Sequence, residues 1–137
     1  MTADSIKIID YRSKNSNKEF VDSLKNSGFA VLYNHQIDIN LINIVYKEWS
    51  EFFSSKEKYD YLFDLKKQDG YFPMKSENAK GCPLKDIKEF YHVYLPWGRI
   101  PDQLKKNTLE IRKQLKEIGI ILLKWIDDLT PPNIKNF

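Results

Sequence analysis

The sequence contains little cysteine, histidine and arginine. Its 137 residues include one cysteine, Cys82, and two histidines, His35 and His92. A single cysteine excludes an internal disulfide framework and a cysteine-based metal site, and it suits a reducing compartment. Cys82 stands between Gly81 and Pro83 with no histidine nearby, so we expect a bystander thiol in a turn and not a nucleophile.

Arginine occurs only at Arg12, Arg99 and Arg112. Its planar guanidinium is the preferred side chain for phosphates and guanine edges, so its scarcity argues against nucleic-acid binding. The formal net charge of +3 comes from lysines scattered among acidic residues, without a basic block.

Long hydrophobic runs are also missing. No uninterrupted apolar stretch approaches the roughly 18 residues of a membrane-spanning helix. Residues 1–10 lack the basic segment and following apolar run of a secretory signal. We therefore expect a protein with no membrane segment, located in the cytoplasm.

The composition is that of a globular protein, with 42% hydrophobic and 14% aromatic residues. A chain of 137 residues is long enough to bury a core and fits one domain. We expect a single domain over residues 1–137, of the α+β class, with helices packed on a few short strands.

The first third of the chain has signals for strand, helix and strand. Residues 6–10 are rich in β-branched side chains and predict a short strand. Ser16 and Glu19 have the spacing of a capping box, and Gly28 can end the following helix in a left-handed conformation. The apolar run at 29–33 is typical of a buried strand.

Two further helices are predicted from apolar periodicity. The first follows Asp38 or Asn40 as N-cap, and its aromatic positions Trp49, Phe52 and Phe53 fit a core better than a stacking platform. Between the two helices, glycines and prolines are dense over 66–101 and predict loops around one or two strands, with 90–95 as the best strand.

The second of these helices is expected to begin at Asp102 and to stop at Pro131. One apolar stripe should face the core of the domain. Further apolar residues lie off that stripe, so this helix needs a cover on a second side. The stripe consists of Ile111, Leu115, Ile118, Leu122, Trp125 and Leu129, and the off-stripe residues include Ile120, Leu123 and Ile126.

Four landmarks follow one another in a fixed order. They are the Gly-Phe-Ala-Val-Leu-Tyr-Asn-His run at 28–35, the Phe52-Phe53 pair with Lys56 and Lys58, the Gly70-Tyr71 pair, and Asp86-x-Lys88-Glu89. Together with the elements between them, they resemble the N-terminal region of the non-haem iron, 2-oxoglutarate-dependent dioxygenases of the isopenicillin N synthase type. The family usually has glycine after the Asn-His pair, whereas this chain has Gln36.

The resemblance implies a domain that packs against a jelly-roll barrel, a double-stranded β-helix. In the family, that barrel binds ferrous iron through a His-x-Asp and a distant His, and binds 2-oxoglutarate through an Arg-x-Ser. This sequence contains neither pattern. We therefore expect the N-terminal, non-catalytic part of such a dioxygenase, truncated or a fragment, with a structural and substrate-framing role. Fe(II) and 2-oxoglutarate belong to the parent family, and we expect neither to be bound by this chain alone.

His35, Asp38 and His92 are the tempting alternative iron ligands. The spacing of His35 and Asp38 is wrong, because an extended chain places residues i and i+2, not i and i+3, on one face. We expect no catalytic and no metal-binding residue here, with Asp38 as a helix cap and His35 satisfied by backbone hydrogen bonds.

The resemblance places Tyr71, Glu89, Tyr91 and His92 nearest the mouth of the barrel, where they could face substrate. The alternative interpretation is structural: Glu89 would pair with a lysine, and the two tyrosines would be packing residues.

A different class of function is also open. The chain could be a free-standing protein-interaction module that uses Ile120, Leu123 and Ile126 to bind a partner or a second copy. Both hypotheses need a cover for that surface, either the missing barrel or another protein. A standalone enzyme with unfamiliar chemistry is a third, weaker hypothesis, because the two histidines and scattered carboxylates form no catalytic pattern.

Overall fold

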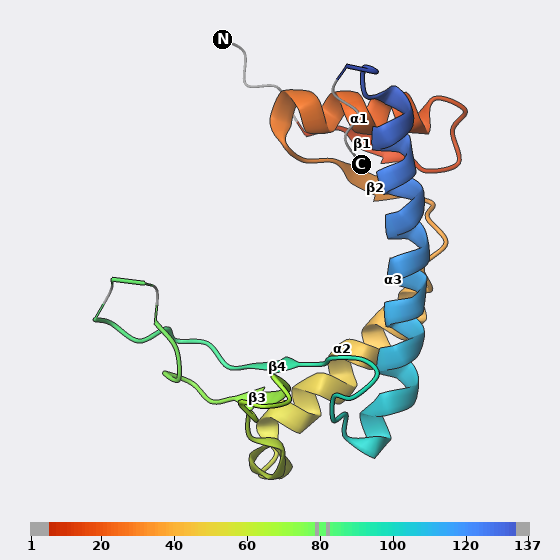
Figure 1. Cartoon of the computed structure of the whole chain (residues 1–137). Coiled ribbons are helices and arrows are strands. Elements are labelled where there is room, and N and C mark those ends of the chain that lie inside the picture. The colour runs from red at the N-terminus through yellow and green to blue at the C-terminus, as the bar shows by residue number, and fades with distance from the viewer. Residues whose placement is uncertain (1–5, 79, 82, 134–137) are drawn as a thin grey trace. The chain divides into compact units, whose positions relative to one another are not determined.

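The structure is a computed structural model that describes residues 6–78, 80–81 and 83–133, so Cys82 lies outside the described residues. The elements follow in the order β1 (Ile8–Asp10), α1 (Ser16–Ser27), β2 (Val31–Tyr33), α2 (Ile39–Ser54), η1 (Glu57–Tyr61), β3 (Gly70–Phe72), β4 (Phe90–His92) and α3 (Asp102–Leu129) (Figure 1). The strands form two small sheets and, within the described ranges, no barrel. The predicted α+β class is confirmed.

The chain divides into two compact units. The first unit comprises Met1–Asp38 and Glu110–Phe137, and the second comprises Ile39–Leu109. Helix α3 begins in the second unit and continues through the first. Whether residues 1–137 behave as a single domain stays a prediction.

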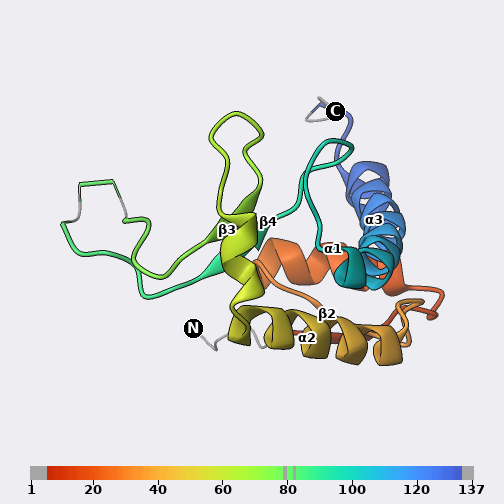
Figure 2. The same cartoon turned by 90° about the horizontal axis from the view of Figure 1, so that it is seen from below.

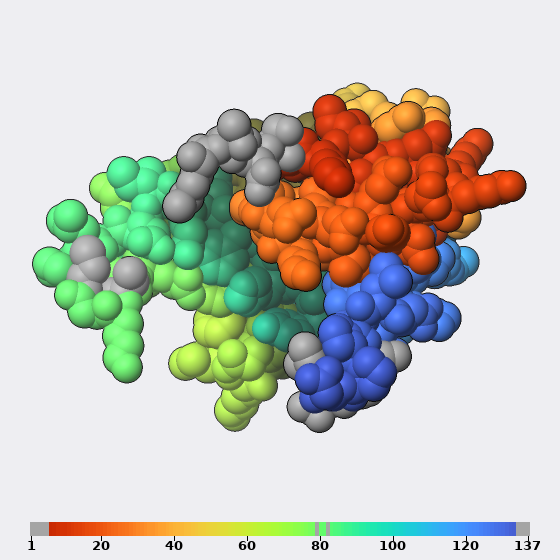
Figure 3. Space-filling model, turned by 90° about the horizontal axis from the view of Figure 1, so that it is seen from above, coloured from red at the N-terminus to blue at the C-terminus, as the bar shows by residue number. Residues whose placement is uncertain are grey.

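In the first unit, β1 and β2 form a parallel pair in which Ile9 lies opposite Leu32. Ile9 of β1 and Phe20 of α1 are both buried. The ring of Trp125, from α3, lies 5.4 Å from that of Tyr11 and 5.8 Å from that of Phe20. Figure 3 shows α1 in orange beside the blue end of α3. Two helices and one face of the sheet therefore share this core.

A buried serine ties α1 to both strands. The hydroxyl of Ser23 donates to the carbonyl of Phe29 at 2.7 Å and accepts from the backbone N–H of Lys7 at 3.4 Å. Both partners lie just outside the strands, where the backbone leaves the ladder. Ser23 therefore satisfies backbone groups that this short sheet cannot satisfy itself.

The predicted end of α1 is confirmed, and its predicted start is wrong. Gly28 has a φ of 78° and its N–H donates to the carbonyl of Leu24, which is a left-handed helix end. The helix already includes Ser16, which is buried, and the capping position is Asn15 without a side-chain hydrogen bond. The capping box fails because the serine is used for packing inside the first turn.

The second predicted strand exists as β2, but its predicted burial is wrong. The alternate residues Phe29, Val31 and Tyr33 are exposed. The apolar run indicated two covered faces, whereas α1 covers only one.

The second unit has an aromatic core between α2 and the start of α3. Phe52, Ile100 and Leu104 are buried, and Trp49, Phe53, Tyr61 and Tyr91 pack against them. The indole N–H of Trp49 donates to the hydroxyl of Thr108 at 2.9 Å, which joins the two helices. Helix α2 begins directly after Asp38, so the predicted helix and its core residues are confirmed.

Strands β3 and β4 form an antiparallel pair that places Gly70 opposite His92 and Tyr71 opposite Tyr91. The predicted strand at 90–95 is confirmed but ends earlier, at His92. Loops extend from this pair, as Figure 2 shows in the yellow-green and green segments. The sheet is small, so contacts outside its ladder must fix its position.

Helix α3 begins at Asp102 and ends at Leu129, before Pro131, as predicted. The predicted stripe is only partly covered, since Leu115 and Leu129 are exposed while Ile111, Ile118 and Leu122 are half-buried. Of the off-stripe residues, Ile120 and Leu123 are exposed and Ile126 is half-buried. Among the described residues, no helix has both the length and the apolar character needed to cross a membrane.

Gly70 should not tolerate a side chain. Its φ is 108°, and an added Cβ would lie 2.5 Å from the carbonyl oxygen of Tyr61. We expect Gly70→Ala to lower the free energy of unfolding by about 2–4 kcal/mol, measured by urea unfolding with tryptophan fluorescence. Gly119→Ala is the control: its Cβ meets nothing within 4 Å, and replacing a helical glycine should stabilise by about 0.5–1 kcal/mol. Equal stabilities of the two variants would contradict the clash.

Candidate functional site

The four candidate substrate-facing residues all lie on or beside the β3–β4 pair, but on two different faces. Tyr71 and Tyr91 are directly opposite each other in the ladder and share one face. His92 pairs with Gly70 and therefore points to the other face, because neighbouring residues of a strand alternate. Glu89 is the residue immediately before β4. The pair therefore has an inner side and an outer side with different partners.

The inner side belongs to the core of the second unit. Tyr71 is buried, and its ring lies 6.1 Å from that of Phe53. The ring of Tyr91 lies 5.1 Å from that of Trp49, and its hydroxyl donates to the carbonyl of Arg99 at 2.9 Å. Burial raises the pKa of the Tyr91 hydroxyl well above its ordinary value. The two tyrosines are packing residues in this structure.

Glu89 is held by a lysine and a tyrosine. Its Oε2 accepts from the hydroxyl of Tyr71 at 2.5 Å and from the Nζ of Lys58 at 2.9 Å. These two hydrogen bonds lower the pKa of Glu89, and the hydrogen bond to Glu89 raises the pKa of Lys58. Lys58, in η1, also donates to the carbonyl of Phe53 at 2.6 Å, so the cluster links α2, η1, β3 and the residue that precedes β4. The predicted pairing of Glu89 with a lysine is confirmed, and the lysine is Lys58.

The outer side of the pair is aromatic. The ring of Phe72 lies 4.4 Å from that of Phe90 in a stacked arrangement, and 4.1 Å from that of Phe63. His92 lies 4.7 Å from Phe72 and 4.9 Å from Phe90, and Tyr94 is 5.9 Å from His92. One face of an antiparallel sheet normally carries polar residues toward solvent. This face is aromatic, and its polar groups are the imidazole of His92 and the hydroxyl of Tyr94.

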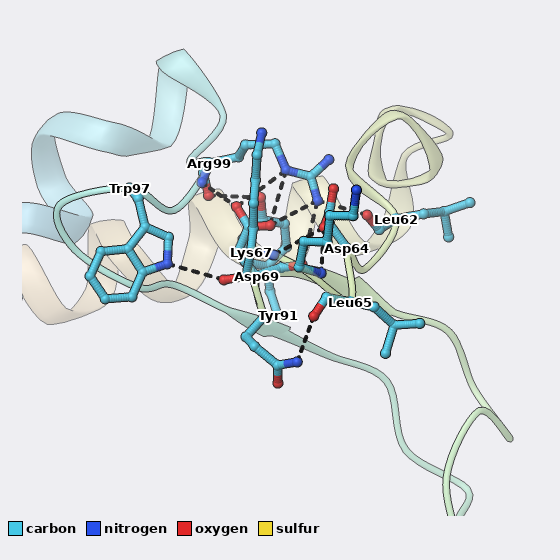
Figure 4. A network of polar contacts seen from close by, with 10 residues as sticks. Leu62, Asp64, Leu65, Lys67, Asp69, Tyr91, Trp97 and Arg99 are labelled. Atoms are coloured by element: carbon cyan, nitrogen blue, oxygen red, sulfur yellow. Dashed lines mark hydrogen bonds and ion pairs between the residues drawn. The ribbon is translucent and has the colours of Figure 1, made fainter.

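A buried ion pair positions the β3–β4 pair, and sequence reasoning missed it. Asp69 is fully buried, and its carboxylate accepts from both the backbone N–H and the guanidinium of Arg99. The guanidinium also donates to the carbonyl of Leu62 at 2.8 Å (Figure 4). Burial alone would raise the pKa of Asp69, but the hydrogen bonds and charge of Arg99 lower it overall. The only sequence signal was a lone arginine just before the last helix.

Neighbouring turns join the same network. The carboxylate of Asp64 accepts from the backbone N–H groups of Lys66 and Lys67, and these bonds lower its pKa. The indole N–H of Trp97 donates to the carbonyl of Lys67 at 3.1 Å (Figure 4). The loop before β3 and the loop after β4 are therefore connected by hydrogen bonds on both sides of Asp69.

The described residues do not fit ferrous iron. Across 6–78, 80–81 and 83–133, no three His, Cys, Asp or Glu side chains gather in a way that could hold a metal ion. His92 lies among aromatic rings, and the Nδ1 of His35 is buried without a hydrogen-bond partner within the described ranges. The expectation that backbone groups satisfy His35 is therefore wrong for this atom. The absence of iron binding by the chain stays a prediction.

A family model described as non-haem dioxygenase in morphine synthesis N-terminal matches residues 6–118. The chain belongs to this family. The match covers the four sequence landmarks and both sheets. A comparison with curated proteins gives no match.

Two solved structures are similar to this dioxygenase N-terminal domain. A candidate oxygenase from Shewanella oneidensis is 44% identical, with a TM-score of 0.84 over 96% of this chain and 45% of that one. A candidate 2OG-Fe(II) oxygenase family protein from Caulobacter crescentus is 23% identical, with a TM-score of 0.71 over 90% of this chain and 48% of that one, and shows the fold alone. The chain thus spans less than half the length of both structures.

The Asp69–Arg99 pair should make stability depend on acid pH. The pKa of Asp69 is lowered on folding, so its contribution is present above the unfolded value of about 3.9 and is lost as the pH falls through the lower folded value. At pH 7 we expect Asp69→Asn to lower the free energy of unfolding by about 3 kcal/mol. The difference in the free energy of unfolding between Asp69→Asn and wild type, measured by urea unfolding, should become smaller below about pH 4. Asp60→Asn, at an exposed position of η1, is the control. A gap that is constant down to pH 2 would refute the assignment.

The Tyr71 hydroxyl should matter for Glu89 and little for packing. We expect Tyr71→Phe to raise the pKa of Glu89, because the carboxylate loses its strongest hydrogen bond, and to destabilise by about 1–2 kcal/mol. The pKa is measured by NMR titration of the carboxyl carbon, and stability by urea unfolding. Tyr46→Phe, at an exposed position of α2, should change neither quantity. An unchanged Glu89 titration in Tyr71→Phe would show that the hydrogen bond is unimportant.

Proposed function

We propose that this chain is the N-terminal, non-catalytic part of an iron- and 2-oxoglutarate-dependent oxygenase, in which it has a structural and substrate-framing role. The coverage of the Shewanella protein supports this most directly: 96% of this chain aligns with only 45% of that one. The family match to an N-terminal domain agrees with it. Iron and 2-oxoglutarate would then be held by residues outside this chain, in a barrel domain, because the described residues offer no suitable ligand group.

The outer side of the β3–β4 pair is the best candidate for the substrate-framing role. Its rings are fixed by mutual contacts, and His92 supplies one polar group among them. Tyr71, Glu89 and Tyr91 would support this surface from behind and not contact substrate themselves, since they are engaged in the core. A wall of rigid aromatic side chains restricts a ligand by shape at little cost in entropy. We expect the protein in the cytoplasm, in keeping with its single cysteine.

A second candidate function is a free-standing interaction module. It is favoured by the exposure of Ile120 and Leu123 on α3, at 57% and 67%. Isolated apolar residues are common on protein surfaces, so this observation carries less weight than the coverage of the oxygenases. A discrete, stable dimer in light scattering would favour the module.

A chimera tests the proposed function. The segment of the Shewanella protein that aligns with this chain is replaced by this chain, and oxygen consumption that depends on iron(II) and 2-oxoglutarate is measured beside the unaltered parent. We expect the chimera to keep at least about a tenth of the parental rate, a loss within 1.4 kcal/mol in the barrier, because the reacting centre is untouched. The isolated chain should neither consume 2-oxoglutarate nor bind iron stoichiometrically in anaerobic titration.

Two results would overturn the proposal. Stoichiometric, tight iron binding by the isolated chain would contradict the placement of the iron in residues outside it. A chimera that does not fold, beside a parent that folds, would show that the chain cannot serve as this part of an oxygenase.

A further inference from the structure

A groove lies between α1 and the end of α3, within the first unit. Its volume is about 630 Å³, inside the range of about 300–1,000 Å³ that small-molecule sites occupy. We call it the α1–α3 groove. Figure 3 shows the two helices that form it, in orange and blue. Its apolar lining residues are Val21, Leu24, Ile126, Leu129 and Pro131.

The apolar lining of the groove is in contact with solvent. Val21, Leu24 and Ile126 are half-buried, and Leu129 is 43% exposed. The hydroxyl of Thr130 also lines the groove, but it already donates to the carbonyl of Ile126 at 2.7 Å. An alkyl chain laid in the groove would remove water from these side chains and from its own surface, which is favourable.

The α1 side of the groove is positively charged. Lys18 and Lys25 line it seven residues apart, so two helical turns, about 10 Å, separate them on one side of α1. Both are exposed, and within the described ranges neither takes part in an ion pair. Asp22 is the carboxylate among the described lining residues, so two lysines face one aspartate. This side favours an anion.

The α3 side of the groove has the opposite electrostatic character. Asp127 and Asp128 lie in the last turn of α3, which contains no basic residue. The carboxyl end of a helix is also its negative end. An anionic group is therefore favoured beside α1 and disfavoured beside the end of α3, where Ile126 and Leu129 suit an apolar chain. The groove thus has a preferred direction for an amphipathic ligand.

The size of the groove favours a small molecule over a protein partner. A stable interface between proteins uses about 20–30 residues a side, whereas nine described residues line this groove. A cationic ligand is disfavoured by the two lysines. A neutral apolar ligand would leave both ammonium groups without a partner.

We infer that the α1–α3 groove binds a long-chain carboxylate, with its carboxylate beside Lys18 and Lys25 and its alkyl chain against Ile126 and Leu129. The site does not depend on the proposed function, because no residue of the β3–β4 pair and no further domain contributes to it. A ligand there would connect α1 to the end of α3 and would stabilise the folded first unit by mass action.

Isothermal titration of the chain with dodecanoate, near neutral pH and below the concentration at which micelles form, tests the site directly. We expect saturable one-to-one binding with a Kd at or below about 1 mM. The shorter octanoate should bind at least about tenfold more weakly, because fewer methylenes are buried. Dodecyltrimethylammonium, with the same chain and the opposite charge, should also bind at least about tenfold more weakly.

Two pairs of variants test the charge and the apolar lining separately. The double variant Lys18→Gln and Lys25→Gln should bind dodecanoate at least about threefold more weakly than wild type. Its control, Lys113→Gln with Lys116→Gln, replaces two exposed lysines of α3 outside the groove and should bind like wild type.

Leu129→Ser should weaken binding at least about fivefold, because the alkyl chain loses an apolar contact. Leu123→Ser is the control, since Leu123 is 67% exposed on the same helix and does not line the groove. Circular dichroism checks that each variant is folded. Without any variant, amide shifts in NMR spectra should change in α1 and at the end of α3 on addition of dodecanoate, and not in β1 and β2.

Several results would overturn the inference. The absence of saturable binding at 1 mM dodecanoate would show that the groove is no such site. Equal binding of the cationic amphiphile, or of the Lys18 and Lys25 double variant, would show adsorption to apolar surface without recognition of the carboxylate. Shifts confined to β1 and β2 would place the ligand elsewhere. Binding to phosphatidylglycerol vesicles without binding of free dodecanoate would identify a lipid surface as the partner instead.

Discussion

The second unit depends on the ion pair of Asp69 and Arg99. A fully buried carboxylate is unfavourable unless charge and hydrogen bonds compensate it, and Arg99 provides both through its guanidinium and its backbone N–H. The same guanidinium binds the carbonyl of Leu62, so three segments meet at one side chain. Such a pair adds little net stability compared with apolar packing, but it fixes geometry, because each alternative arrangement leaves a buried charge unpaired.

That geometry explains why Gly70 and the two tyrosines stand where they do. The chain leaves Asp69 with a positive φ at Gly70, where the backbone passes so close to Tyr61 that no Cβ fits. One residue later Tyr71 enters the core, and its hydroxyl meets Glu89 beside Lys58. The alternation then places Phe72 on the outer side. A polar anchor at one residue thus decides which aromatic side chains lie on the inner side of the pair and which on the outer side, where Phe72 is also buried.

Periodicity predicted what depends on neighbours in sequence, and failed where distant groups decide. The helices at 39–54 and 102–129 and the left-handed end at Gly28 follow from local spacing. Ser16 has the residue type of an N-cap but is buried within the first helical turn, which no local pattern records. The pairing of Asp69 with Arg99 spans 30 residues, and charged residues of both signs are common in this chain, so no spacing distinguished it.

The candidate site shows the same division. Residue type and order predicted that Glu89 pairs with a lysine, but Lys58 as the partner emerges only when the strands bring both to Tyr71. That Tyr91 and His92 lie on opposite sides follows from strand alternation, whereas which side is the core depends on packing against Trp49. Adjacent residues in the sequence can thus have unrelated roles.

The most informative wrong prediction concerns β2. Its composition predicts a buried strand, whereas one side of the strand is exposed. Five consecutive apolar residues are selected by surroundings that exclude water on both sides of a strand. Helix α1 excludes it on one side only, so the side chains of Phe29 and Val31 remain in solvent. A disagreement between the burial that a sequence is suited to and the burial found in the structure therefore locates a missing contact.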